Sequence, residues 1–343
     1  MPYTTINKGS SYFDTKLYTG TGTTQSVTGL AFQPDLVWIK DRVAADYHWW
    51  TDAVRGATKT LHSNVSTAET TQATSLTAFG SSGFTLGSDA SVNRNGDTFV
   101  SWNWLANNTS GSSNTAGTIT STVAANTTAG FSIVTYTGAG GASTVGHGLG
   151  VAPRLIILKG RSNARIWVIG QTSLGWTKYM SFDSNAVETN NYWNDTAPTS
   201  SVFSVFNSVN VNGSGETYVA YCFAEIRGYS KFGTYTGNGD ANGPFVYTGF
   251  KPAFLIIKQS SSAGENWYMW DNKRDTFNLT NKRLYPNLSN SEETPTISLD
   301  LLSNGFKPRS TYTGFNQSGG TFIYIAFAEN PFVTSGGIPV TAR

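Results

Sequence analysis

Charged residues and cysteine are both scarce in this chain of 343 residues. Asp, Glu, Lys and Arg together make up 13% of it, against about 25% in a typical soluble protein. Aromatic residues reach the same 13%. A weakly charged chain with so many large rings is typical of packed β-structure, and this composition excludes a coiled coil or an intrinsically disordered chain.

Cys222 is the one cysteine of the chain, which excludes an intramolecular disulfide and a thiolate metal cage. The three histidines, His48, His62 and His147, have no metal-ligand spacing. The glycine-rich stretch at 138–150 leads into a strand pattern and not into a helix that could hold a phosphate. We therefore expect no metal site and no cofactor.

Long apolar runs and basic tracts are absent as well. No run approaches the roughly 18 apolar residues of a membrane span, and residues 1–11 lack the basic and apolar segments of a signal peptide. The formal net charge of +2 comes without a cluster of Lys and Arg, so phosphate contacts cannot accumulate. We expect neither membrane insertion nor a nucleic-acid partner.

The chain does contain a threefold internal repeat. Three blocks recur in the same order: Tyr-Thr-Gly, a proline followed six residues later by lysine, and a closing block with alternating large apolar residues. The first block starts at Tyr18, Tyr136 and Tyr235, the second at Pro34, Pro153 and Pro252, and the third spans 96–104, 215–223 and 319–327. A tryptophan, at Trp49, Trp167 or Trp267, follows each proline by 14 or 15 residues.

The repeat divides the chain into three units of about 100 residues, the size of a β-sandwich domain. We expect unit one at 12–106, unit two at 130–228 and unit three at 229–332. Residues 107–129 are expected to be a linker, since Ser, Thr, Asn, Gly and Ala dominate them. Residues 1–11 have too few apolar side chains to join a core and are assigned to an N-terminal docking arm, and 333–343 form a C-terminal tail.

The patterns within each unit predict antiparallel β-structure. The runs after the repeated prolines are short, continuous and apolar, as in a central strand that is covered on both faces. The closing blocks alternate with a period of two, so Val100, Trp102 and Trp104, like their counterparts, should face a core. We predict an all-β fold of three tandem antiparallel β-sandwich units, with the three repeated tryptophans in the core.

The acidic residues do not indicate a catalytic pair. Glycan hydrolysis uses two carboxyl groups about 5 to 9.5 Å apart, but the acids do not recur between units, and Asp52 and Asp271 face an alignment gap near Gly170. The conceivable pairs, Asp271 with Asp275 and Asp46 with Asp52, are better explained as exposed turn residues. We expect no catalytic residues and no enzymatic activity.

Aromatic residues without counterparts in the other units are the candidate ligand-binding residues, because Trp and Tyr stack on the apolar faces of sugars. They are Tyr192, Trp193, Trp50, Tyr47, Trp176 and Trp270. Tyr192 and Trp193 are favoured over the others because they lie in a polar, turn-rich stretch. An aromatic anchor at a subunit interface would have the same pattern.

Several stretches carry a family resemblance. The chain has Phe-Ala-Glu-Asn-Pro-Phe at 327–332, opens with Met-Pro-Tyr-Thr-Thr-Ile-Asn-Lys at 1–8, and contains the blocks 29–40 and 52–59. With these stretches it resembles tail-fibre-like virion structural proteins of tailed bacteriophages, those of marine and cyanobacterial phages in particular. The resemblance implies a virion protein that is assembled in the host cytoplasm without export, serves as a tail fibre or related surface appendage, and forms a homotrimer.

The partners expected on this reading are other virion proteins, reached through the docking arm, and a host-surface glycan or receptor. Two further functions stay open at this point. One is an architectural decoration of the phage head or tail with no ligand. The other is a polysaccharide-degrading tailspike, for which parallel β-helix repeats and a paired-carboxylate groove would be the signature.

Overall fold

The computed structural model describes residues 4–182, 187–296 and 298–331. Strands account for 42% of the described residues and helices for 4%, so the predicted all-β fold is confirmed. In these ranges the helical parts are α1 (Ala90–Asn93), α2 (Thr313–Asn316), and the 3-10 turns η1 (Gly9–Ser11) and η2 (Asn191–Trp193). No helix in the same ranges is long and apolar enough to cross a membrane.

Unit one contains a large and a small antiparallel sheet. The large sheet has the order β1 (Phe13–Thr19), β9 (Thr98–Trp104), β3 (Leu36–Asp41), β4 (Trp49–Asp52), β5 (Lys59–His62) and β6 (Thr70–Thr71). The small sheet has the order β2 (Gln25–Thr28), β8 (Gly83–Leu86) and β7 (Leu76–Gly80). Val37, Phe84 and Phe99 belong to a buried cluster between the two sheets, as in a β-sandwich.

Unit two repeats this arrangement with more strands. Its large sheet has the order β10 (Ser112–Asn114), β11 (Ser121–Asn126), β12 (Phe131–Thr137), β19 (Thr217–Phe223), β14 (Leu155–Gly160), β15 (Trp167–Gln171), β16 (Lys178–Met180) and β17 (Val187–Thr189). Its small sheet consists of β13 (Ser143–Gly146) and β18 (Val202–Val205). Val134, Ile156 and Phe203 are buried together between the sheets.

Unit three has the same two parts. Its large sheet has the order β20 (Ser230–Thr236), β26 (Thr321–Pro331), β22 (Phe250–Gln259) and β23 (Trp267–Asp271). Its small sheet has the order β21 (Val246–Tyr247), β25 (Gly305–Pro308) and β24 (Leu299–Leu302). Phe306 on the small sheet packs edge to face on Tyr324 of the large sheet, with ring centroids 5.4 Å apart.

One strand order recurs in the three large sheets: β1-β9-β3-β4, β12-β19-β14-β15 and β20-β26-β22-β23. The apolar run that follows each repeated proline belongs to β3, β14 or β22, and each of these strands lies between two others. These runs are therefore the central strands that the sequence predicts. The recurring order agrees with the sequence repeat, and the superposition of the three units as one sandwich fold stays a prediction.

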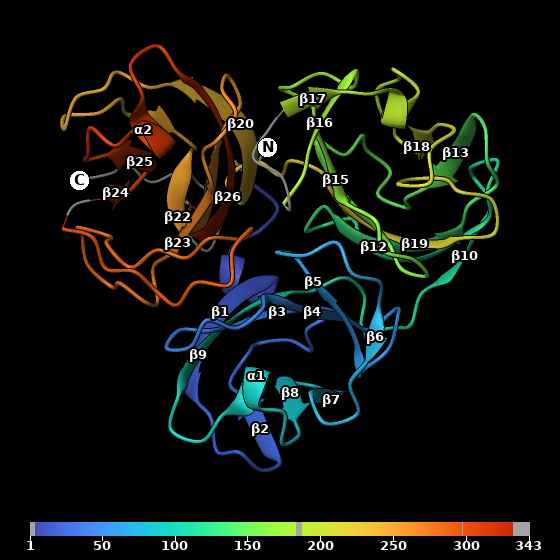
Figure 1. Ribbon diagram of the computed structural model, residues 1–343, viewed down its shortest axis with the longest axis horizontal. Coiled ribbons are helices and arrows are strands. Elements are labelled where there is room, and N and C mark those ends of the chain that lie inside the picture. The colour runs from blue at the N-terminus through green and yellow to red at the C-terminus, as the bar shows by residue number, and fades with distance from the viewer. Residues whose placement is uncertain (1–3, 183–186, 297, 332–343) are drawn as a thin grey trace.

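The three units surround one shared aromatic core. Figure 1 shows the three lobes placed around a common centre. Trp102 on β9, Tyr221 on β19 and Ile325 on β26 are buried in this same cluster, on the faces that the alternating pattern predicts. Rings from different units touch here: the centroids of Trp50 and Trp167 lie 5.2 Å apart. The sequence predicts a separate core for each unit, and it misses this shared one.

Strand register corrects the position of the repeated tryptophan in unit one. Trp167 and Trp267 pair with the lysine that closes the central strand, whereas Trp49 pairs with the isoleucine before that lysine. The three tryptophans are buried as predicted, but their equivalence is wrong by one residue. Because neighbours in a strand point to opposite faces, Trp49 lies in the small core of unit one, and Trp50 lies in the shared core.

The described part of the N-terminal segment is not a free docking arm. Ile6 is fully buried in the shared core, and η1 contacts β1 and β26. One buried apolar side chain is enough to anchor a short polar segment against a core. The expectation that residues 1–11 stay outside the core is therefore wrong for residues 4–11.

Residues 107–129 are not a free linker either. β11 pairs with β12 along its whole length, and β10 pairs with β11. This polar segment thus extends the large sheet of unit two. The expectation failed because backbone hydrogen bonds hold an edge strand, and side-chain composition does not reveal them. The expected tail, 333–343, lies outside the described residues.

Candidate functional site

Five of the six aromatic residues predicted to bind a ligand are buried. Trp50, Trp176, Tyr192, Trp193 and Trp270 are between 0 and 8% exposed. η2 turns Tyr192 and Trp193 into the core of unit two, where they contact aromatic rings, while the polar residues around them face solvent. A ring enclosed in a core cannot stack on a sugar. The assignment of these five residues to a ligand surface is therefore wrong.

Tyr47 is the sixth predicted residue, and it does reach the surface. Its exposed fraction is 47%. It lies just before β4 in unit one, and its ring centroid is 5.0 Å from that of His62. Tyr47 thus stays a prediction as a ligand-binding residue.

Asp52 and Asp271 are buried and do not lie in exposed turns. They end β4 and β23, and both are fully buried. Each carboxylate accepts a hydrogen bond from the arginine three residues later, Arg55 or Arg274. The expectation of exposed turn residues is wrong here because these strands end at the junctions between units.

The conceivable partners of these two acids bind other groups. Asp46 forms an ion pair of 2.9 Å with Arg94. Asp275 accepts hydrogen bonds from the backbone N–H groups of Asn281 and Lys282 at 2.7 and 2.6 Å. Neither predicted carboxylate pair therefore forms a shared acid–base site.

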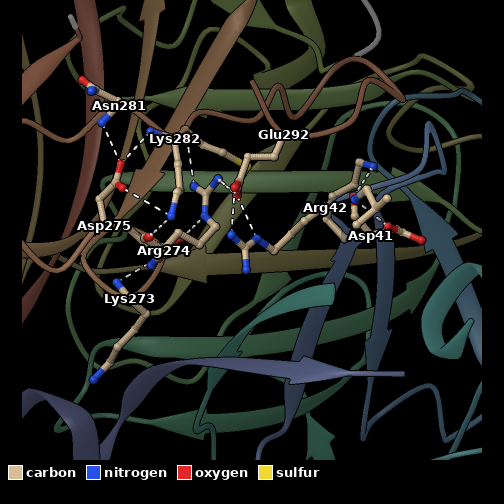
Figure 2. A network of polar contacts seen from close by, with 12 residues as sticks. Asp41, Arg42, Lys273, Arg274, Asp275, Asn281, Lys282 and Glu292 are labelled. Carbon is tan, nitrogen blue, oxygen red and sulfur yellow. Dashed lines mark hydrogen bonds and ion pairs between the residues drawn. The ribbon is translucent and has the colours of Figure 1, made fainter. Parts of the chain in front are cut away.

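The buried carboxylates instead hold neighbouring units together. The indole N–H of Trp102, in unit one, donates to Asp271 of unit three at 3.1 Å. Figure 2 shows how the network continues: Glu292 of unit three accepts hydrogen bonds from Arg274 of the same unit at 3.2 Å and from Arg42 of unit one at 2.8 and 2.9 Å. The carboxylates of this network therefore have structural partners.

A surface cavity of about 350 Å3 beside the start of β20 is the candidate ligand site. Its lining combines an aromatic ring, three charged side chains and two hydroxyl groups. The lining residues are Glu225, Arg227, Gly228, Ser230, Lys231, Tyr247 and Thr248. The cavity lies within the roughly 300 to 1,000 Å3 that small-molecule sites occupy.

One exposed aromatic ring marks this site. Tyr247 of β21 lies between the buried Val246 and Thr248 and is 53% exposed. The alternation follows from strand geometry, because the small sheet buries every second side chain. Lys231 lies over the Tyr247 ring, with its Nζ 5.1 Å from the centroid, and donates a hydrogen bond to the Tyr247 carbonyl at 3.2 Å. The Tyr247 ring is thus held in place while one part of it faces solvent.

The Tyr247 ring has no aromatic counterpart in the other units. Register on the small sheets aligns Val246 with Val27 and Val145, because each of these valines pairs with a phenylalanine. The position of Tyr247 is Thr28 in unit one and Gly146 in unit two. The signal in the sequence is Phe-Val-Tyr between Gly-Pro and Thr-Gly, and the sequence analysis missed it.

No group of three or more His, Cys, Asp or Glu side chains in the part of the chain that the structure describes could hold a metal ion. Residues 8–331 match the model of a protein family described as a domain of unknown function, DUF7483. The chain belongs to this family. No curated protein and no solved structure matches the chain.

Proposed function

We propose that this protein is a non-enzymatic structural protein of a tailed-phage virion, a tail fibre or related surface appendage, that binds a host-surface glycan or receptor. The observation that carries the binding role is the cavity with the half-exposed Tyr247 ring. Aromatic rings stack on the apolar faces of sugars, and the charged and hydroxyl groups around Tyr247 suit sugar hydroxyls. This DUF7483 protein would then contact its host through unit three.

The architecture supports a scaffold that presents a surface site. The shared core and the buried Arg–carboxylate pairs tie the three units together, and a rigid body of this kind positions surface residues precisely. The strand pairs of the described sheets are antiparallel, whereas a tailspike of the β-helix type has parallel strands. Together with the occupied carboxylates, this favours an attachment protein over a polysaccharide-degrading enzyme.

The binding role is tested with purified protein and lipopolysaccharide from a panel of cyanobacterial and other marine bacteria. Replacing Tyr247 with alanine should lower the affinity at least tenfold, or about 1.4 kcal/mol. Tyr47→Ala, at the exposed ring predicted from the sequence, tests the alternative position, and it should leave the affinity unchanged if the Tyr247 cavity is the site. If Tyr47→Ala abolishes binding and Tyr247→Ala does not, the site predicted from sequence is the right one.

The virion role is tested by cryo-electron microscopy of the particle that carries this protein. We expect its density on a fibre or another exposed appendage of the tail. Density spread over the head shell or the tail tube, with no glycan binding in solution, would favour the architectural decoration instead.

Trimer formation is part of the proposal, because multivalent display turns weak sugar contacts into firm attachment. Light scattering should then give three times the chain mass of 36.9 kDa. A monodisperse particle with the mass of one chain at micromolar concentration would remove this part of the proposal and leave the binding role intact.

A further inference from the structure

Two further cavities, one on unit three and one between unit three and residues 8–14, share an unsatisfied polar side chain in their walls. The cavities measure about 190 and 150 Å3, and Asn272 lines both of them. Asn272 is 93% buried, and its side-chain oxygen has no hydrogen-bond partner in the described part of the chain. Among the described buried side chains with an unpaired polar atom, Asn272 is the one that lines these cavities.

This asparagine is particular to unit three. The backbone N–H groups of Ala53, Thr172 and Asn272 donate to the residue after the repeated proline in unit one, two or three, so the three positions are equivalent. The fold therefore does not require an amide here. A buried polar group without a partner is costly to keep, which points to a ligand that supplies the missing donor.

An exposed aromatic ring stands at the rim of the larger cavity. Phe277 lines this cavity and is 85% exposed, more than any other large apolar side chain in the described ranges. The loop that carries it is tied down on both sides. Asp275 accepts two backbone hydrogen bonds, as Figure 2 shows, and the side chain of Asn278 both donates to and accepts from the backbone of Leu301 at 3.0 and 2.9 Å. The Phe277 ring is thus presented by an ordered loop.

The two cavities are also connected by an ion pair. Lys251 lines the larger cavity and Glu329 the smaller one, and their side chains lie 2.8 Å apart. Lys273 and Asp14, on the wall of the smaller cavity, are 3.9 Å apart. The walls hold three cations in all, Lys8, Lys251 and Lys273, and three carboxylates, Asp14, Asp275 and Glu329. Because these formal charges balance, an uncharged polar ligand suits the walls better than an anion.

We propose that the Asn272 cavities form a second sugar-binding subsite, in which Phe277 stacks on a neutral hexose or N-acetylhexosamine and a hydroxyl or amide N–H of the sugar bonds to Asn272. The proposal rests on the glycan-binding role proposed above and adds a subsite to it. Each cavity is smaller than the roughly 300 Å3 at which drug-sized pockets begin, so one sugar ring per cavity is the size that fits.

The subsite is tested by saturation-transfer NMR and calorimetric titration of the full chain with glucose, galactose, N-acetylglucosamine and N-acetylgalactosamine. At least one of these sugars should bind. Phe277→Ala should weaken that binding at least fivefold, and the exposure of this ring means that the variant keeps the fold. Asn272→Ala should also weaken it, while Phe245→Ala, at an exposed ring that lines neither cavity, should not change it.

The outcomes separate this proposal from the one on which it rests. If no sugar of the panel binds, or if binding is unchanged in both Phe277→Ala and Asn272→Ala, the second subsite is wrong. If in that case lipopolysaccharide still binds and Tyr247→Ala abolishes its binding, the general glycan-binding role stands without the second subsite. If the unmodified protein binds neither lipopolysaccharide nor any sugar of the panel, both the glycan-binding role and the second subsite are wrong.

Discussion

The junction between units two and three differs from the other two junctions of the molecule. Between units one and two, the phenol of Tyr221 donates to the buried Asp52 at 2.7 Å, and Glu69 binds Arg161 at 2.9 and 3.1 Å. The junction between units three and one repeats this arrangement: Trp102 donates to the buried Asp271. Glu292 there binds Arg42 and Arg274, as Figure 2 shows. Between units two and three, Gln171 donates to the carbonyl of Tyr324 at 3.4 Å.

Register explains this difference. Asp52, Gln171 and Asp271 pair with equivalent residues of the three central strands, so Gln171 is the counterpart of the two acids. The alignment gap expected near Gly170 is therefore absent. Leu174 takes the place of the arginine three residues after each acid, and Ser260 follows β22 where Arg42 and Arg161 follow the other central strands.

The residue across the junction decides which side chain is tolerated. In the two charged junctions the neighbouring large sheet supplies a donor, Tyr221 or Trp102, whereas the equivalent strand position in unit three is Ile325. A buried carboxylate needs both a cation and further donors. Where the neighbouring residue is apolar, like Ile325, burying an uncharged amide costs less free energy than burying a carboxylate. The comparison teaches that a buried acid and its donor across the junction occur together, although they lie far apart in the sequence.

The largest expected effect comes from removing the buried cation. Arg55→Met and Arg274→Met should each lower the free energy of unfolding by about 3 to 5 kcal/mol, because they leave a buried carboxylate without its charge partner. Leu174→Met places the same side chain at the equivalent position of unit two. It should lower the free energy of unfolding by less than about 1.5 kcal/mol. Urea unfolding of the three variants measures this, and equal losses would contradict the difference between the junctions.

A smaller effect is expected from removing one donor. Tyr221→Phe should cost about 1 to 3 kcal/mol, since Asp52 loses a hydrogen bond but keeps Arg55. Gln171→Leu, in the uncharged junction, should cost less than about 1 kcal/mol, because it removes a single long hydrogen bond and adds apolar volume. Thermal and urea unfolding check the order. A larger loss in Gln171→Leu than in Tyr221→Phe would show that the amide, and not the acid, is the stronger link.

The smallest effect is a pH dependence at the junction between units three and one. Burial acts to raise the pKa of Glu292, but the hydrogen bond and charge of Arg42 and the charge of Arg274 outweigh it and lower the pKa below 4.5. A depressed carboxyl pKa stabilises the folded state above the unfolded pKa, and this contribution is lost as the pH falls through the folded pKa.

Glu292→Gln should therefore cost roughly 1 to 2 kcal/mol at pH 7, and the difference from the unmodified protein should shrink as the pH drops below about 4.5. Burial raises the pKa of Asp35 to about 6 against hydrogen bonds from the Asn108 and Ala106 backbone. Asp35 has the opposite pH dependence, but both proteins contain it, so it cancels in the difference. A difference that stays constant between pH 7 and pH 3 would contradict the assigned role of Glu292.

The candidate sites could be predicted from the sequence only in part. Tyr247 meets the criterion of an aromatic residue without counterparts. The same criterion selected Trp50, which the shared core buries, and Trp270, which packs on Tyr268 and Phe315 of its own unit. Exposure of a ring depends on what packs over its strand face, and for Trp50 the covering rings, Trp167 and Tyr221, come from a different unit. The Asn272 cavities gave no sequence signal, since an asparagine after a strand is typical of any turn.

The sequence by itself determined the local structure. Alternating side chains, prolines that open strands and glycine-rich turns specify which segments are strands and which faces are apolar, because these properties depend on near neighbours. Only the tertiary structure decided that the three apolar faces meet in one core, that Asp52 and Asp271 become buried links, and that Ile6 joins them. The partners of each acid lie 169 positions away across a junction, and pairing over such a distance depends on how whole sheets pack.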